Sequence, residues 1–268
     1  MPAMRLYDHV VEQAVLVTPI WQPQLDTQAA GFLRMTHTTN AQMPTIFLAP
    51  STLDLGFYRE HFPHTDVLTF DSRHFTSVAA YSAWMTTPEV YEALSGPTWM
   101  VLCQTDAVII RSLTDLDLTF SRSSSPIDYV GSVWSPPVRV LALGTRLVID
   151  SPTGATRGPW FARVLGRRLR VGNGGLSIRR IERFRTVAAR LTRELPRRIV
   201  ENCYEDVLFC TYGPSRGLRI ASPAQASTVF SETEVVGCSV LPDTYGFHAL
   251  PRWNPILADA LLKQVADG

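Results

Sequence analysis

The sequence predicts an α/β protein with one doubly wound, mostly parallel central sheet flanked by helices. Apolar runs of strand character alternate with stretches of helical spacing, and short segments connect them. This order is typical of parallel strands joined by right-handed crossovers. Of the 268 residues 46% are hydrophobic, which is ample for a packed core.

The first part of the chain supplies three predicted strands and their helices. The strands are predicted over 14–20, 45–49 and 67–70, and the helices over 24–36, 53–61 and, in two pieces, 75–94. Thr18 and Pro19 end the first strand, and Asp71 follows the third. These residues are therefore expected at the carboxyl edge of the sheet, where open α/β sheets bind ligands.

A fourth strand is interrupted by an acid. The apolar run 99–103 stops at Gln104, Thr105 and Asp106, and apolar residues then resume. An unpaired buried carboxylate costs several kcal/mol or more, so Asp106 should face a crevice that contains a cation or hydrogen-bond donors. We hypothesise that Asp106 holds a divalent metal, the alternative being that it only caps a turn.

The second half adds three further polar features. Asn173-Gly174-Gly175 predicts a sharp turn or a close approach of ligand to backbone, followed by a helix over 178–195 that Ser177 caps. Glu205 and Asp206 stand at the start of a predicted helix, where carboxylates are favoured. His248 lies in a loop before the closing helix, 254–265. Strand character returns over 127–134 and 139–150.

Each polar feature also has a purely structural explanation. Asn-Gly-Gly is common in hairpins, paired acids often only begin a helix, and a lone histidine in a loop is usually at the surface. The order of the four features along the chain is more informative than any one of them.

Five segments in order, QTDAVII, DYVGSVW, VGNGGLSIRR, YEDVLF and GFHAL, resemble a widespread family of GT-A-like glycosyltransferases known only as a domain of unknown function. The resemblance covers roughly residues 14–250. More distantly, the layout is similar to that of Fringe and β-1,3-galactosyltransferase enzymes. The resemblance to the GT-A-like family implies a Rossmann-type GT-A fold in a single domain, residues 1–268. A nucleotide-binding half would cover about 14–112 and an acceptor half about 113–268.

The resemblance also implies roles for individual residues. Asp106 matches the last acid of the family's Asp-x-Asp element, which binds Mn²⁺ or Mg²⁺ between the phosphates of a nucleotide sugar. Gln104 stands where many relatives have the first acid, so this chain has one charge fewer. His248 matches a C-terminal histidine ligand, which favours Mn²⁺. Asp206 is the candidate base, and Glu205 would orient it or bind the acceptor.

The remaining implied contacts belong to the donor, with uridine as the expected nucleotide. Donor-contacting residues would be Thr18, Pro19, Asp71, Gln104, Thr105, Asn173, Gly174, Gly175 and Arg179. The implied reaction moves a hexose to a hydroxyl of a glycan or lipid-linked acceptor. A single base indicates inversion at the anomeric carbon.

Charge and cysteine content limit the partners. A net charge of +1 provides no global field for nucleic acid. The one local bias is the arginine-rich segment 157–198, which is either a solvated face or a cationic rim for a diphosphate, an anionic acceptor or a membrane surface; Arg179 and Arg180 lie closest to the glycines. Scattered cysteines in apolar contexts predict buried free thiols and a cytoplasmic location, peripheral to the membrane if the rim binds it.

Two other functions fit parts of the pattern. The segment LGTRLV at 143–148 is superficially similar to the phosphate loop of sugar-phosphate nucleotidyltransferases, but that loop should follow the first strand. Gln104 also permits an inactive relative that only binds glycans or nucleotide sugars.

Overall fold

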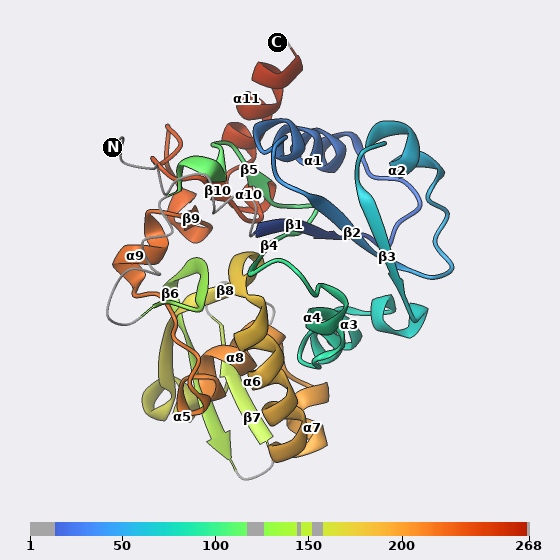
Figure 1. Cartoon of the computed structure of the whole chain (residues 1–268). Coiled ribbons are helices and arrows are strands. Elements are labelled where there is room, and N and C mark those ends of the chain that lie inside the picture. The colour runs from blue at the N-terminus through green and yellow to red at the C-terminus, as the bar shows by residue number, and fades with distance from the viewer. Residues whose placement is uncertain (1–13, 117–125, 144–145, 152–157, 267–268) are drawn as a thin grey trace, which may run out of the picture.

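The computed structural model describes residues 14–116, 126–143, 146–151 and 158–266 (Figure 1). Its main sheet has seven strands in the order β3-β2-β1-β4-β8-β6-β7. The strands are β1 (Ala14–Pro19), β2 (Thr45–Pro50), β3 (Asp66–Phe70), β4 (Trp99–Cys103), β6 (Tyr129–Leu143), β7 (Arg146–Asp150) and β8 (Arg167–Arg180). The predicted α/β class is confirmed, and β4 takes the central position.

The sheet is mixed rather than mostly parallel. The first four strands pair in parallel, as their crossover helices require, whereas β8, β6 and β7 pair antiparallel. Leu143 pairs with Arg146, so the paired ends of β6 and β7 are separated by only two residues in the chain, which antiparallel strands alone allow. The parallel core is therefore extended by a second, antiparallel half.

Helices cover the sheet close to where the sequence predicts them. Those of the first half are α1 (Thr27–Thr39), α2 (Gly56–His61), α3 (Val78–Met85) and α4 (Glu89–Ala93). Those of the second half are α5 (Trp160–Leu165), α6 (Ile181–Glu194), α7 (Arg197–Glu201), α8 (Glu205–Tyr212), α9 (Pro223–Ser227), α10 (Leu250–Trp253) and α11 (Pro255–Ala266). The closing helix α11 lies beside α1 in Figure 1, so the chain end returns to the first half.

The helix predicted from residue 178 is wrong at its start. Ile178 pairs with Val101 of β4 and Val130 of β6, so residues 178–180 continue strand β8 and α6 begins at Ile181. Within α6 the buried side chains recur every three or four residues, and the arginines between them face water. The part of the arginine-rich segment that lies in α6 is thus a solvated helix face.

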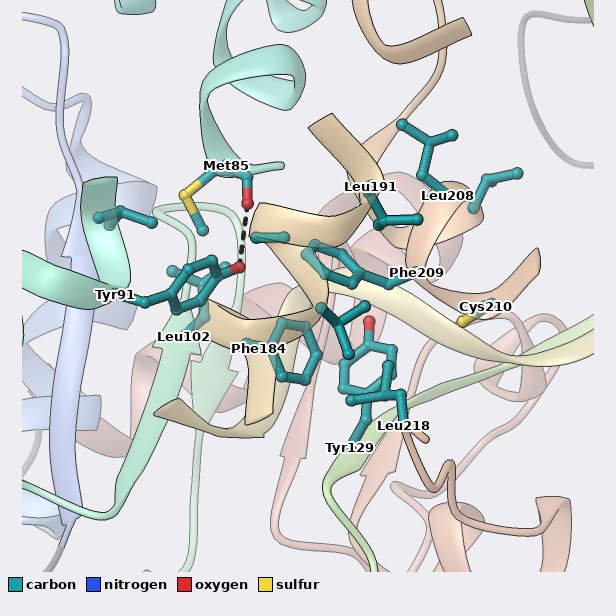
Figure 2. Close-up of a cluster of buried hydrophobic side chains, with 14 of the residues drawn as sticks. Met85, Tyr91, Leu102, Tyr129, Phe184, Leu191, Leu208, Phe209, Cys210 and Leu218 are labelled. Carbon is teal, nitrogen blue, oxygen red and sulfur yellow. Dashed lines mark hydrogen bonds between the residues drawn. The ribbon is translucent and has the colours of Figure 1, made fainter. Parts of the chain in front are cut away.

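An aromatic core packs against the antiparallel half of the main sheet and is centred on Phe184 of α6 (Figure 2). Its ring centroid lies 4.5 Å from that of Phe209, 5.2 Å from that of Tyr129 and 5.6 Å from that of Tyr91. The Tyr91 hydroxyl donates to the Met85 carbonyl at 3.0 Å, so the polar atom that enters this core is satisfied. The core joins α4, α6 and α8 to the sheet.

A separate three-stranded sheet was not foreseen from the sequence. It consists of β5 (Val108–Ile109), β10 (Gly246–Phe247) and β9 (Phe230–Ser231), in that spatial order. Strand β10 pairs antiparallel with β5 and parallel with β9. Three distant parts of the chain therefore meet just beyond the carboxyl end of β4.

The expectation of buried free thiols can be compared with the structure. All four cysteines lie within the described residues and are free thiols, and three of them are buried. Across the described part of the chain, no helix has both the length and the apolar character needed to cross a bilayer. The compartment stays a prediction.

The packing of His37 makes stability depend on pH. Its ring contacts Phe47 and Phe62, at centroid distances of 5.7 and 5.0 Å, and burial lowers its pKa to about 4. Unfolding restores an ordinary histidine, which binds a proton below about pH 6.5. The contribution of the neutral His37 to the free energy of unfolding is therefore fully present above about pH 7. It is lost as the pH drops toward 4, by roughly 2 kcal/mol between pH 7.5 and 5.

Urea unfolding at the two pH values tests this. In His37→Phe, the difference in the free energy of unfolding between the two pH values should shrink by that amount. The exposed His64 provides the control, because His64→Gln should retain it. An unchanged pH dependence in His37→Phe would contradict the assignment.

Candidate functional site

Three ionisable side chains, Asp106, Glu232 and His248, lie together at one corner of the small sheet. Strand β5 begins two residues after Asp106, β9 ends just before Glu232, and β10 ends just before His248. Backbone bonds fix the junction: Ala249 N donates to the Asp106 carbonyl at 3.1 Å, and His248 N donates to the Ser231 carbonyl at 3.0 Å. Asp106 and His248 were expected here from the sequence, but Glu232 was not.

His248 lies between two carboxylates. Its Nδ1 is 3.3 Å from Glu232 Oε1, and its Nε2 is 3.6 Å from Asp106 Oδ1. Burial would lower the pKa of His248, but Asp106, Glu232 and Asp206 together raise it to about 9. The corner therefore favours a positive charge on or beside this imidazole.

The residues present fit a divalent cation. When the imidazole is neutral and its Nδ1 proton is directed at Glu232, the lone pair of Nε2 can bind a metal, whose charge would take the place of the Nε2 proton. Nε2 is a buried atom without a hydrogen-bond partner. Asp106 offers an exposed carboxylate on the other side, with 55% of its side chain accessible. Within the described residues no group of three or more His, Cys, Asp or Glu forms a metal site, so an ion here would need further ligands from a bound molecule and water.

Two glycines of β8 make room for these side chains. A Cβ on Gly175 would lie 2.1 Å from His248 Nε2 and 2.7 Å from Gln104 Oε1, and one on Gly174 would lie 2.3 Å from Glu205 Oε1. The expected sharp turn is wrong, since β8 continues through them with a register shift opposite Gly131 and Ser132. The backbone at these glycines is closely approached, as expected, but by side chains of the protein itself.

The acidic start of α8 packs against the same glycines. Asp206 is half-buried, and its Oδ2 accepts from Gly174 N at 3.1 Å. Burial and the neighbouring Glu205 raise the pKa of Asp206 to about 7, against hydrogen bonds from Gly174 and Val207. Because Gly174 and Gly175 are adjacent, Asp206 and His248 are within roughly 11 Å of each other. The four expected features thus converge.

Arg179 does not face a donor, contrary to expectation. Its side chain is fully buried and its Nη2 lies 3.1 Å from Glu205 Oε1 and 3.1 Å from the Gly174 carbonyl. Its guanidinium also lies over the rings of Tyr129 and Phe184. Arg179 therefore supports the site from beneath, and Glu205, buried with it, has no free face for an acceptor. Arg180 is likewise paired, 3.6 Å from the buried Asp128.

Asn173 is also committed to the protein. Its Nδ2 donates to Glu232 Oε2 at 2.8 Å, and its Oδ1 accepts from Gly175 N at 2.8 Å. It therefore links the glycine segment to the carboxylate that holds His248. Because the sequence does not single out Glu232, this chain of contacts could not be predicted from it.

A cavity of about 520 Å³ opens beside the corner, a suitable volume for a cofactor-sized ligand. Its lining residues are Trp21, Phe75, Thr76, Ser77, Val78, Tyr81, Gln104, Thr105 and Asp106. Gln104 and Thr105 are thus accessible to a ligand in the cavity, and their contact with a donor stays a prediction. Thr18 and Pro19 do not line the cavity, because they are buried in β1. Asp71 also stays outside it and caps the short 3₁₀ helix η3 (Ser72–Phe75), its Oδ1 accepting from Arg73 N at 2.9 Å.

The fold and this site define a GT-A-like α/β protein. Over nearly its full length the chain is similar to the structure of an active-site mutant of LgtC, with 11% identity, 94% and 95% of the two chains covered, and a TM-score of 0.51. Apo mouse xyloside xylosyltransferase 1 matches with 8% identity, coverage of 90% and 98%, and a TM-score of 0.49. CMP:2-keto-3-deoxy-manno-octonic acid synthetase complexed with CTP matches with 13% identity, coverage of 95% and 99%, and a TM-score of 0.47.

The chain belongs to the DUF5672 family, described as "protein of unknown function", whose model matches residues 64–248. The matched region includes every residue of the corner, from Asp106 to His248. A search of curated protein sequences finds no significant match. The family thus confirms the resemblance seen in the sequence, and the function has to be argued from the site.

Breaking the buried pair tests its structural role. Arg179→Met leaves the Glu205 carboxylate buried and unpaired, so we expect a loss of about 3–5 kcal/mol in the free energy of unfolding. The double variant Arg179→Met/Glu205→Met should recover much of that loss, as urea titrations can measure. If the losses in Arg179→Met and Glu205→Met simply add up to the loss in the double variant, the two side chains are not coupled and the pairing is contradicted.

Proposed function

We propose that this protein is a glycosyltransferase that moves a sugar from a nucleotide-sugar donor to an acceptor hydroxyl. The observation that supports this best is the convergence of Asp106, His248 and Asp206 around two glycines, beside a cavity at the carboxyl end of β4. β4 and β1 are adjacent while β2 and β3 extend the other way, so this is the topological switch point of the sheet.

Asp106 and His248 would hold a divalent cation, with Mn²⁺ preferred over Mg²⁺ because one ligand is an imidazole. The ion supplies electrostatic stabilisation to the departing nucleoside diphosphate when bound. Glu232 keeps the imidazole oriented through Nδ1, and Asn173 keeps Glu232 in place. Gln104, in place of a second acid, lines the cavity as a neutral side chain.

Asp206 is the group best suited to take the acceptor's proton. A base works best with a pKa near the working pH, and that of Asp206 is raised to about 7. The bond from Gly174 N orients the carboxylate, and the buried Glu205–Arg179 pair fixes the helix start that carries it. With one such base, transfer would proceed with inversion.

The cavity would bind the nucleotide, with uridine as our expected base. Trp21, two residues beyond Pro19, lines the cavity with 45% of its surface exposed and can stack on a base. The aromatic ring thus takes the role that the sequence assigned to Thr18 and Pro19.

A nucleotidyltransferase is less well supported by the structure. Of the segment LGTRLV, Leu143 ends β6 and residues 146–148 begin β7 at the far edge of the sheet, while residues 144–145 lie outside the described residues. The connection from β1 to α1, where a phosphate loop would lie, reads IWQPQLD and contains no glycine. An inactive binding relative is the remaining alternative, and hydrolysis of nucleotide sugars with added Mn²⁺ separates it from an enzyme.

Removing the proposed ligands should abolish metal-dependent donor binding. In calorimetry with UDP-sugars and Mn²⁺, Asp106→Ala and His248→Gln are expected to lose at least about tenfold in affinity. The exposed acid Asp259 on α11 offers a control, since Asp259→Ala should bind like the wild type. Undiminished affinity in Asp106→Ala would refute the metal role.

Replacing the proposed base should separate binding from turnover. Asp206→Asn preserves the acceptor for the Gly174 N–H but cannot take a proton, so transfer should fall by about 100-fold or more while donor affinity is retained. NMR of the product would show inversion at the anomeric carbon. Full activity in Asp206→Asn, or retention of configuration, would remove Asp206 from this role.

A further inference from the structure

Helix α5 carries an unusual apolar surface. It reads WFARVL, and only Ala162 is fully buried, whereas Trp160, Val164 and Leu165 are 74, 67 and 69% exposed. Positions 160 and 164, and positions 161 and 165, are each four residues apart, so the four large side chains form one continuous face. Packing within the described residues does not explain this face.

Arginines surround the same helix with little opposition. Arg163 lies on α5, and the exposed Arg167, Arg168 and Arg170 follow it directly in β8. The one acid between Tyr129 and Ile181 is Asp150, whose buried carboxylate already accepts from Gly158 N and Arg163 Nε. Arg168 pairs across the ladder with Arg139, which increases the local positive charge.

We propose that this α5 patch, formed by Trp160, Val164, Leu165, Arg168 and Arg170, binds an anionic lipid membrane surface. Exposed aromatic and aliphatic side chains next to arginines are typical of elements that lie in the bilayer interface. A second copy of the chain fits less well, because a two-fold contact through the patch would bring the arginine clusters together.

The strand that carries the patch arginines also contacts the helix that carries the proposed base, through Arg167 on its other face. Arg167 Nη1 donates to the carbonyl of Thr211, near the end of α8, and Asp206 stands at the start of the same helix, roughly 8 Å away along its axis. Resting on the proposed function, this connection indicates an acceptor presented from the lipid surface, in the class of lipid-linked glycans. The membrane binding itself needs no turnover.

Sedimentation with vesicles tests the proposal. The wild type should bind vesicles of phosphatidylcholine mixed with phosphatidylglycerol, bind much less to phosphatidylcholine alone, and dissociate as salt rises. Trp160→Ser/Leu165→Ser should lower binding at least about tenfold, and Arg168→Glu/Arg170→Glu should do likewise. Ile256→Ser on α11 is the matched control, because Ile256 is 78% exposed and α11 lies at the opposite end of the molecule from α5 (Figure 1).

Thermal unfolding should be unchanged in all three variants, because the altered side chains are exposed. Wild-type protein that does not bind anionic vesicles, or patch variants that bind like Ile256→Ser, would overturn the proposal. So would self-association of the wild type, seen by ultracentrifugation, that Trp160→Ser/Leu165→Ser removes. None of these failures affects donor binding with Mn²⁺, so the proposed function is tested separately.

Discussion

The pairing of β5, β9 and β10 is the constraint on which the proposed site depends. Each strand has two residues, yet together they bring Asp106 to one corner with Glu232 and His248, which follow more than a hundred residues later in the chain. Parallel pairing of β9 with β10 aligns the ends that precede Glu232 and His248, and antiparallel pairing with β5 brings the Asp106 side to them. A shift of register by one residue would turn these side chains to the other face.

A second constraint lies beneath the glycines. Arg179 and Glu205 form a buried pair whose remaining hydrogen bonds go to Ser177, Tyr91, Ser82 and the Gly174 carbonyl. Such a pair contributes little net stability but permits few other arrangements of β8 and α8. The proposed base thus stands on a helix start whose position is set by charges that never reach solvent.

Parts of this site could be predicted from the sequence because they interrupt strong local patterns. Asp106 breaks a buried strand, and Glu205 with Asp206 begins an amphipathic segment, so both were recognisable. Glu232 was not, because two-residue strands have no periodicity and nothing near Glu232 marks it as buried. Arg179 was misplaced because LSIRRIERF reads equally as strand or helix, and only pairing with β4 and β6 decides that its side chain points into the core. The parallel half of the sheet was predictable from its crossovers, whereas the order of the antiparallel strands was not.

The proposed function depends on His248 presenting Nε2 to a cation that a nucleoside diphosphate also binds. Electron spin echo envelope modulation of Mn²⁺ bound together with uridine diphosphate measures this directly, because it detects a coordinated imidazole nitrogen. We expect a nitrogen coupling in the wild type that vanishes in His248→Gln. A bound Mn²⁺ that shows no nitrogen coupling would contradict it.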